Sequence, residues 1–197
     1  LNLAHTYNKL SIFFDYGRGG VEGGRTYYFD DVKFIGDGIA PLGPLVALAD
    51  GYLYGTTSGG GASGNGTLFR LKLDGSGFET VYVFSATRVS SGASVNQDGA
   101  VPVAGLTDGD DGLLYGVTTI GGTAGFGTVF AFDPDEEDLS VLHNFDGTRG
   151  SRPTGELLLA TDGKLYGTTA TGGSNSTGTA TSFGTIFSIG RDGTGIG

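Results

Sequence analysis

The sequence contains no cysteine, no methionine and no tryptophan, and it has only two histidines among 197 residues. Without cysteine there is no disulfide framework, no thiolate zinc site and no thiol nucleophile. Histidine is the usual base near neutral pH, so acid–base catalysis has few candidate residues. The absence of tryptophan removes the largest aromatic face on which a sugar ring could stack. Together these absences favour a protein that is not an enzyme.

Positive charge and long apolar runs are also scarce. A helix that crosses a membrane needs about 20 consecutive apolar residues, and no such run occurs, so we expect no membrane span. Lys and Arg number 11 against 21 Asp and Glu, which gives a net charge of −10. Because this charge repels phosphate backbones, we expect no nucleic-acid partner. The composition suits an extracellular or cell-surface protein. The chain begins at Leu1 without a signal peptide, and we interpret it as a processed or fragmentary mature chain.

Glycine and aromatic residues are abundant, and one phrase is written three times. There are 40 Gly, 13 Phe and 9 Tyr; the aromatic content argues against disorder, and no G-X-Y period points to collagen. The phrase appears as GYLYGTT at 51–57, GLLYGVT at 112–118 and GKLYGTT at 163–169. Each copy is followed by a glycine-rich loop and a strand-like run that begins with Gly-Thr. We therefore treat the chain as a series of internal repeats.

The runs between the glycine-rich loops have the character of strands. They are apolar or alternating over about 5–7 residues and are bounded by Gly, Asp, Asn and Ser, which predicts an all-β protein. A period of about 40–60 residues with four strands per unit is typical of propeller blades or stacked β-arrays. We expect three four-strand, propeller-like repeats, at about 39–85, 86–147 and 148–197. Because a closed propeller needs about 4–8 blades, we expect an open array, preceded by a strand pair within residues 1–38.

The repeated phrase resembles a known family. Three stretches match the pattern DGxLYGTTxxGGxxGxGTVFxL, namely 50–57 with 66–69, 111–118 with 127–130, and 162–169 with 184–187. This pattern is similar to the tandem GloVer repeats of bacterial secreted and surface proteins. The resemblance covers about residues 41–195. It implies a propeller-like all-β repeat outside the cell, with no established enzymatic activity.

Residues 1–38 do not carry the phrase. Their stretch TYYFDDV at 26–32 resembles the last strands of a jelly-roll carbohydrate-binding module. In such modules acids of the last strand help to hold a structural calcium, so the resemblance implies Asp30 and Asp31 as candidate calcium ligands. We expect no other cofactor. The same segment fits the repeat frame, with strands around 10–16 and 27–35 in the frame of those that would follow the third phrase.

Six aromatic residues recur at matching positions of the three units: Tyr54, Tyr115 and Tyr166, and Phe69, Phe130 and Phe187. The tyrosines could stack on sugars, but residues that recur with the scaffold are more typical of a core, so we predict that all six form the repeat core. The sequons at 65–67 and 175–177 make Asn65 and Asn175 candidate glycosylation sites.

Three functions follow from these observations. The first is a non-enzymatic subunit of an extracellular filament or surface layer whose partners are copies of itself. In this hypothesis residues 1–36 donate strands head-to-tail to the open edge after the third phrase, and a neighbouring subunit holds the glycine-rich tail at 191–197. The second is a module that binds polysaccharide or a cell surface. The third is a fragment of a larger secreted glycoside hydrolase. We favour the first.

Overall fold

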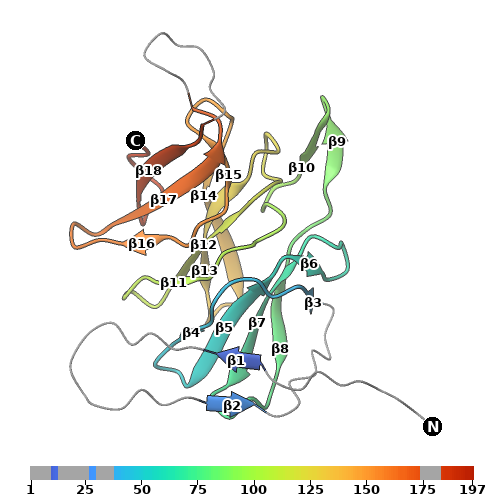
Figure 1. The fold of residues 1–197 in the computed structure, drawn as a ribbon, viewed down its shortest axis with the longest axis vertical. Coiled ribbons are helices and arrows are strands. Elements are labelled where there is room, and N and C mark those ends of the chain that lie inside the picture. Colours follow the sequence, from blue (N-terminus) through green and yellow to red (C-terminus); the bar gives the residue numbers. More distant parts are fainter. Residues whose placement is uncertain (1–9, 13–26, 30–37, 174–182) are drawn as a thin grey trace.

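A computed structural model of the chain describes residues 10–12, 27–29, 38–173 and 183–197. Every regular element in these residues is a β-strand, and the sheets are open and antiparallel (Figure 1). The predicted all-β fold is therefore confirmed. Within the same residues there is no helix long and apolar enough to cross a membrane.

Two sheets follow the simple up-and-down order expected from the sequence. The first sheet consists of β4 (Val46–Ala47), β5 (Tyr52–Thr57), β7 (Thr67–Lys72) and β8 (Glu79–Val83). The second sheet consists of β11 (Thr107–Asp108), β12 (Leu114–Thr118), β13 (Thr128–Asp133) and β14 (Asp138–Asn144). Both have a register shift at the same step, between Leu68 and Phe69 in the first and between Val129 and Phe130 in the second. Matching sequence patterns thus produce matching topology, including its irregularity.

The third sheet has a different order. It consists of β15 (Ser151–Pro153), β16 (Leu158–Leu159), β17 (Lys164–Thr171) and β18 (Thr185–Gly190). Both β15 and β16 pair with β17, while β18 pairs with β17 along a register from Thr169↔Thr185 to Lys164↔Gly190. In the described residues no strand takes the place beside β18 that β8 and β14 take in the other sheets. Three equal four-strand units are therefore not confirmed.

The remaining strands form two-stranded pairs. They are β1 (Leu10–Ile12) with β2 (Tyr27–Phe29), β3 (Gly38–Ile39) with β6 (Gly59–Gly60), and β9 (Arg88–Ser90) with β10 (Ala93–Val95). The first pair lies inside the two ranges where N-terminal strands were expected, and these strands pair with each other.

The repeated phrase is explained by two local contacts. In the second sheet the hydroxyl of Tyr115 donates to Asp111, four residues earlier, at 2.9 Å, and the same bond joins Tyr to Asp in the other two sheets. The glycine that follows the tyrosine lies opposite a phenylalanine on the next strand, as Gly116 does with Phe130. A Cβ on Gly116 would come within 2.4 Å of that ring, so only glycine fits there.

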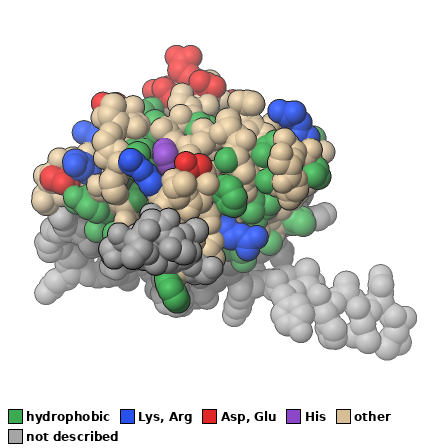
Figure 2. Space-filling model, turned by 90° about the horizontal axis from the view of Figure 1, so that it is seen from above, with side chains coloured by type: hydrophobic (Ala, Val, Ile, Leu, Met, Phe, Trp, Pro, Cys, Tyr) green, Lys and Arg blue, Asp and Glu red, His purple; other side chains and the backbone are tan. Residues whose placement is uncertain are grey.

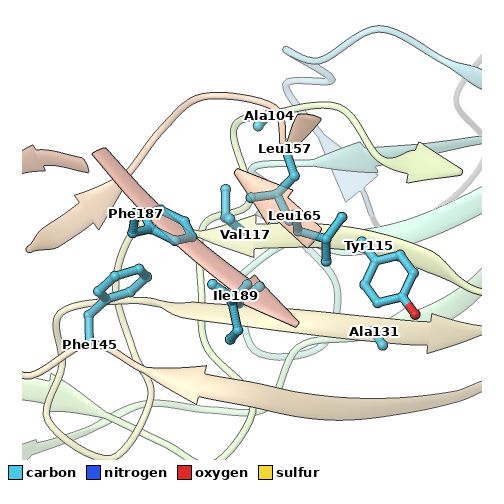
Figure 3. Close-up of a cluster of buried hydrophobic side chains, with 10 residues drawn as sticks. Ala104, Tyr115, Val117, Ala131, Phe145, Leu157, Leu165, Phe187 and Ile189 are labelled. Atoms are coloured by element: carbon cyan, nitrogen blue, oxygen red, sulfur yellow. The ribbon is translucent and has the colours of Figure 1, made fainter. Parts of the chain in front are cut away.

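The sheets are stacked in chain order, and apolar side chains join each sheet to the next (Figure 1). Between the first and second sheets the cluster is Tyr54, Leu68, Val81 and Phe84 with Leu106, Leu114, Phe130 and Phe132. Between the second and third sheets, shown in Figure 3, the cluster includes Tyr115, Val117, Phe145, Leu157, Leu165, Phe187 and Ile189. The rings of Phe145 and Phe187 meet edge to face with centroids 5.2 Å apart. The second and third sheets therefore each bury one face against the preceding sheet.

Candidate functional site

The third sheet has an uncovered face, which we call the outer face: the side of β17 and β18 that points away from the second sheet. Ile186 of β18 is 80% exposed, whereas the residues at its position in the other two sheets, Leu68 and Val129, are completely buried. Thr168 is exposed and Tyr166 is only partly buried, although Tyr54 and Tyr115 are buried at equivalent positions. The outer face thus keeps the apolar pattern of a covered face without a cover.

The burial along the strands shows the same contrast. All five residues of β12 are buried, because β12 lies in a sheet that is covered on both faces. Along β17 buried and exposed residues alternate for most of the strand. Successive side chains of a strand point to opposite faces of its sheet, so alternation is expected where only one face is covered. Figure 2, which views the molecule from above, shows hydrophobic side chains at the surface among basic, acidic and neutral ones.

The edge of β18 is also open for part of its length. The N–H and C=O of Ser188 both bond to Gly197, on the side away from β17. Residues two apart in an antiparallel strand point their backbone groups to the same side, so those of Ile186 also face away from β17. Among the described residues no backbone partner occurs there, although Val129, at the same position in the second sheet, pairs with His143. One step of the β18 ladder is therefore available to another strand.

The glycine-rich tail is held by its own chain. Besides the two bonds between Ser188 and Gly197, Nη1 of Arg149 donates to the carbonyl of Ile196 at 2.7 Å. Ile196 also packs against the cluster between the second and third sheets. The tail is therefore positioned by its own chain, and the expectation that a neighbouring subunit holds it stays a prediction.

A cavity of about 740 Å³ opens between the second and third sheets. Its lining includes Asp108, Asp110, Glu156 and Leu158. Arg191, also in the lining, donates to the carbonyl of Gly109 at 2.7 Å and to Asp111 at 2.9 Å. The arginine is thus engaged in joining the third sheet to the second, and the cavity keeps an excess of acidic side chains.

Burial shifts the titration of several groups near these surfaces. It raises the pKa of Tyr54 to about 12, with a further contribution from its bond to Asp50, and it raises the pKa of Tyr115 in the same way. Burial also raises the pKa of Glu156 and lowers the pKa of His143. The raised tyrosine values mean that the folded chain favours their neutral form.

The residues predicted from the sequence have different outcomes. Five of the six repeat aromatics are buried (Tyr54, Tyr115, Phe69, Phe130 and Phe187), and Tyr166 is the one that is only partly buried.

The candidate glycosylation and calcium sites are not tested by the structure. Nδ2 of Asn65 donates to the carbonyl of Ser85, and the carbonyl of Asn65 accepts from the N–H of Val101 at 2.8 Å. Glycosylation of Asn65 stays a prediction. Asp30, Asp31 and Asn175 lie outside the described residues, so the calcium site and the second glycosylation site also stay predictions. In the part of the chain that is described, no group of three or more His, Asp or Glu residues is arranged as metal ligands.

Sequence reasoning missed the outer face as a surface and the cavity. The outer face had one signal in the sequence: no segment like VLHNF follows the third Gly-Thr strand. The cavity had none, because its lining comes from two sheets whose relative placement the sequence does not show.

Comparison with known proteins adds little. No protein-family model matches the sequence, so the resemblance to GloVer repeats stays a prediction, and no curated protein matches. Among solved structures, a protein described as a TolB from Agrobacterium tumefaciens is similar with a TM-score of 0.44 and 12% sequence identity. The match covers 74% of this chain and 41% of that protein, so this chain spans less than half the length of the structure it resembles.

Proposed function

We propose that the three sheets are blades of an open, propeller-like repeat array, and that the protein is a non-enzymatic structural subunit that assembles head-to-tail outside the cell. The observation that carries the proposal is the outer face of the third sheet. An isoleucine that is 80% exposed there replaces residues that are fully buried in both other sheets. Repeats of this kind cannot bury both faces alone, so an uncovered face is a place where a further unit binds.

The open edge of β18 makes the proposed contact between copies head-to-tail. The β18 step at Ile186 presents backbone N–H and C=O groups without a partner among the described residues. In their described parts β1 and β2 pair with each other and not with β18. Donation of residues 1–36 to the β18 edge of a second copy would pair unlike surfaces, and a contact of unlike surfaces propagates into a filament when it does not close.

The setting of the proposal is the cell surface. The net charge of −10 disfavours nucleic acid, and the resemblance to GloVer repeats suggests an extracellular place.

We propose no catalytic role for His143, which lies in β14 with its ring centroid 4.9 Å from that of Phe145. In an assay with common β-glucans we expect no turnover. A measurable turnover that is lost in His143→Gln would contradict the non-enzymatic function.

Electron microscopy of unconcentrated protein tests the assembly. We expect long regular filaments from the full chain and dispersed particles after deletion of residues 1–36. Filaments formed by the truncated chain would overturn strand donation. A full chain that stays monomeric at all concentrations would overturn self-assembly itself.

A second candidate function, polysaccharide binding, has one observation in its favour. The cavity between the second and third sheets offers carboxylates and the Thr107 hydroxyl as hydrogen-bonding groups. Among the lining residues that the structure describes none is aromatic, although aromatic faces are the usual platforms for sugar rings. Titration with soluble β-glucan distinguishes the functions: binding that is lost in Glu156→Gln but kept in Glu136→Gln, an acid of the exposed β13–β14 turn, would favour polysaccharide binding.

A further inference from the structure

A short segment recurs at the start of each unit, and we call it the Gly-x-x-Pro segment. It is Gly-Ile-Ala-Pro at 38–41, Gly-Ala-Val-Pro at 99–102 and Gly-Ser-Arg-Pro at 150–153. The residue before the proline has a positive φ in all three copies: 56° at Ala40, 59° at Val101 and 56° at Arg152. Left-handed backbone is unusual for non-glycine residues and above all for valine. Three unrelated side chains therefore share one backbone bend, which marks the segment as the same structural device each time.

Inside the chain, the second and third copies each dock on the preceding sheet. The N–H of Val101 donates to the carbonyl of Asn65 at 2.8 Å, and the ring of Pro102 lies against Gly66. A Cβ on Gly66 would be 2.8 Å from Cδ of Pro102, so the proline occupies the space that a side chain would need.

The next copy makes the same contacts. The N–H of Arg152 donates to the carbonyl of Phe126 at 2.9 Å, and a Cβ on Gly127 would lie 2.9 Å from Cδ of Pro153. A carbonyl followed by a glycine thus forms a socket for the segment, and both internal sockets are filled.

The third sheet carries the same socket on its outer side. Phe183 and Gly184 stand where Asn65–Gly66 and Phe126–Gly127 stand, and Gly184 has a φ of 77°. Among the described residues none bonds to the carbonyl of Phe183, and its side chain is 91% exposed. Thr168 lies at the position of Thr56, whose hydroxyl donates to the carbonyl of Ala104 across the first interface at 2.9 Å. The socket is therefore complete and exposed.

The first sheet carries the matching segment without a socket. Pro41 is exposed, whereas Pro102 and Pro153 are buried. Ile39 and Leu42 are 64% and 63% exposed. The apolar side chains of the adjoining sheet face, such as Leu53 and Phe69, are already buried, so what remains for contact is the segment itself.

We propose that residues 38–42 of a second copy dock in the socket at Phe183–Gly184. In this contact Ala40 N–H donates to the Phe183 carbonyl and Pro41 lies on Gly184, as in the two internal interfaces, and Thr168 adds a hydroxyl, as Thr56 does in the first. The inference rests on the proposed head-to-tail assembly and names its contact. It differs from strand donation because it does not use residues 1–36.

Two exposed substitutions test the docking in the full chain by sedimentation velocity. Leu42→Lys blocks the segment and Ile186→Lys blocks the socket, and both positions are solvent-exposed, so the folded chain tolerates the lysine. We expect each variant alone to self-associate at least tenfold more weakly than the wild type. A 1:1 mixture should form dimers and no larger species, because each variant keeps one working surface. Val89→Lys, at an apolar residue of β9 that is 81% exposed, should assemble like the wild type.

The outcomes separate the inference from the function beneath it. If both variants assemble like the wild type, or if their mixture stays monomeric, the docking is wrong while head-to-tail assembly stands. If the wild type itself does not associate, self-assembly fails, and a synthetic peptide of residues 38–48 then tests the docking alone. Amide shift changes at Phe183 and Ile186 on adding the peptide would support the docking, and their absence would overturn it.

Discussion

The second and third sheets share a sequence pattern but differ in what surrounds them. Val129 and Ile186 occupy the same position after Gly-Thr, and the first is fully buried while the second is 80% exposed. In β12 every residue is buried, whereas β17 alternates. The phrase thus specifies strand, turn and pairing, but the burial of the outer face depends on the unit that follows. This is the behaviour of repeat proteins, in which each unit contacts only its neighbours.

The comparison also shows that the exposed position stays apolar. A surface strand that has no partner normally carries charges or proline at its edge, which discourage pairing with other chains. Ile186 and Phe183 instead keep large apolar side chains in solvent. An exposed apolar pattern beside an open ladder marks an interaction surface.

The largest expected effect is in the core that joins the sheets. Leu114→Asp places a charge without a partner at a fully buried position of β12, so we expect the free energy of unfolding to fall by about 4 kcal/mol. Urea denaturation measures the loss. The control is Glu136→Ala in the exposed β13–β14 turn, which should change stability by at most about 0.5 kcal/mol. Similar losses in both variants would contradict the alignment of the units.

The next effect compares the two sheets at a single position. Val129→Ala removes two buried methyl groups and should cost about 2 kcal/mol. Ile186→Ala removes side-chain atoms that are already in solvent and should cost about 0.5 kcal/mol or less in the monomer. If urea denaturation showed equal losses of unfolding free energy in Val129→Ala and Ile186→Ala, the outer face would be covered in solution at the protein concentration used.

Much of the fold could be predicted from the sequence because the strongest signals are local. The spacing from Asp111 to Tyr115 and the Gly-Thr strands identify hairpins, and burial of the recurring tyrosine follows where a next unit exists. Tyr166 differs because its cover would be another unit, and a local pattern does not carry that information. The Gly-x-x-Pro segments give only a weak sequence signal, because their two middle residues change from Ile-Ala to Ala-Val to Ser-Arg. What the copies share is the backbone bend, which appears only in the structure.

A third effect is a dependence of stability on alkaline pH. The pKa of Tyr115 in the folded chain lies above its ordinary value of 10.0, chiefly because the side chain is buried. Below pH 10 the residue is neutral in both states and its contribution is fully present; as pH rises further, the unfolded chain ionises first and stability falls. For Tyr54, whose folded pKa is about 12, the loss runs from about pH 10 to 12. We expect the unfolding free energy of the wild type to fall over this range.

Two tyrosine variants sharpen the comparison of the sheets. Tyr115→Phe should make the alkaline fall in stability shallower and cost about 1 kcal/mol at neutral pH through the lost bond to Asp111. The pKa of Tyr166 is raised mainly by its hydrogen bond to Asp162, in an exposed setting. Tyr166→Phe should therefore change the alkaline fall of the unfolding free energy less than Tyr115→Phe does. If the unfolding free energy fell equally steeply with alkaline pH in both variants, burial would not be what distinguishes the titration of Tyr115 from that of Tyr166.

The smallest expected effect concerns the glycine-rich tail at 191–197. It lies beside β18 of the third sheet at the place that β14 has beside β13 in the second sheet. Gly197 pairs with Ser188 as Ser140 pairs with Ala131 in the second sheet, so the tail lies where β14 runs. β14 continues to Asn144 and is held by a full ladder, whereas the tail has two ladder bonds, the Arg149 contact and the packing of Ile196. Arg149→Ala should therefore leave global stability within about 0.5 kcal/mol of the wild type and still speed amide exchange at Ser188 and Gly197, because few contacts oppose local opening. Arg152→Ala, at an exposed arginine, is the matched control and should leave both amides unchanged. Unchanged amide exchange in Arg149→Ala would mean that the Arg149 contact does not help to hold the tail. The tail would then be held beside β18 much as β14 is held beside β13, by backbone pairing.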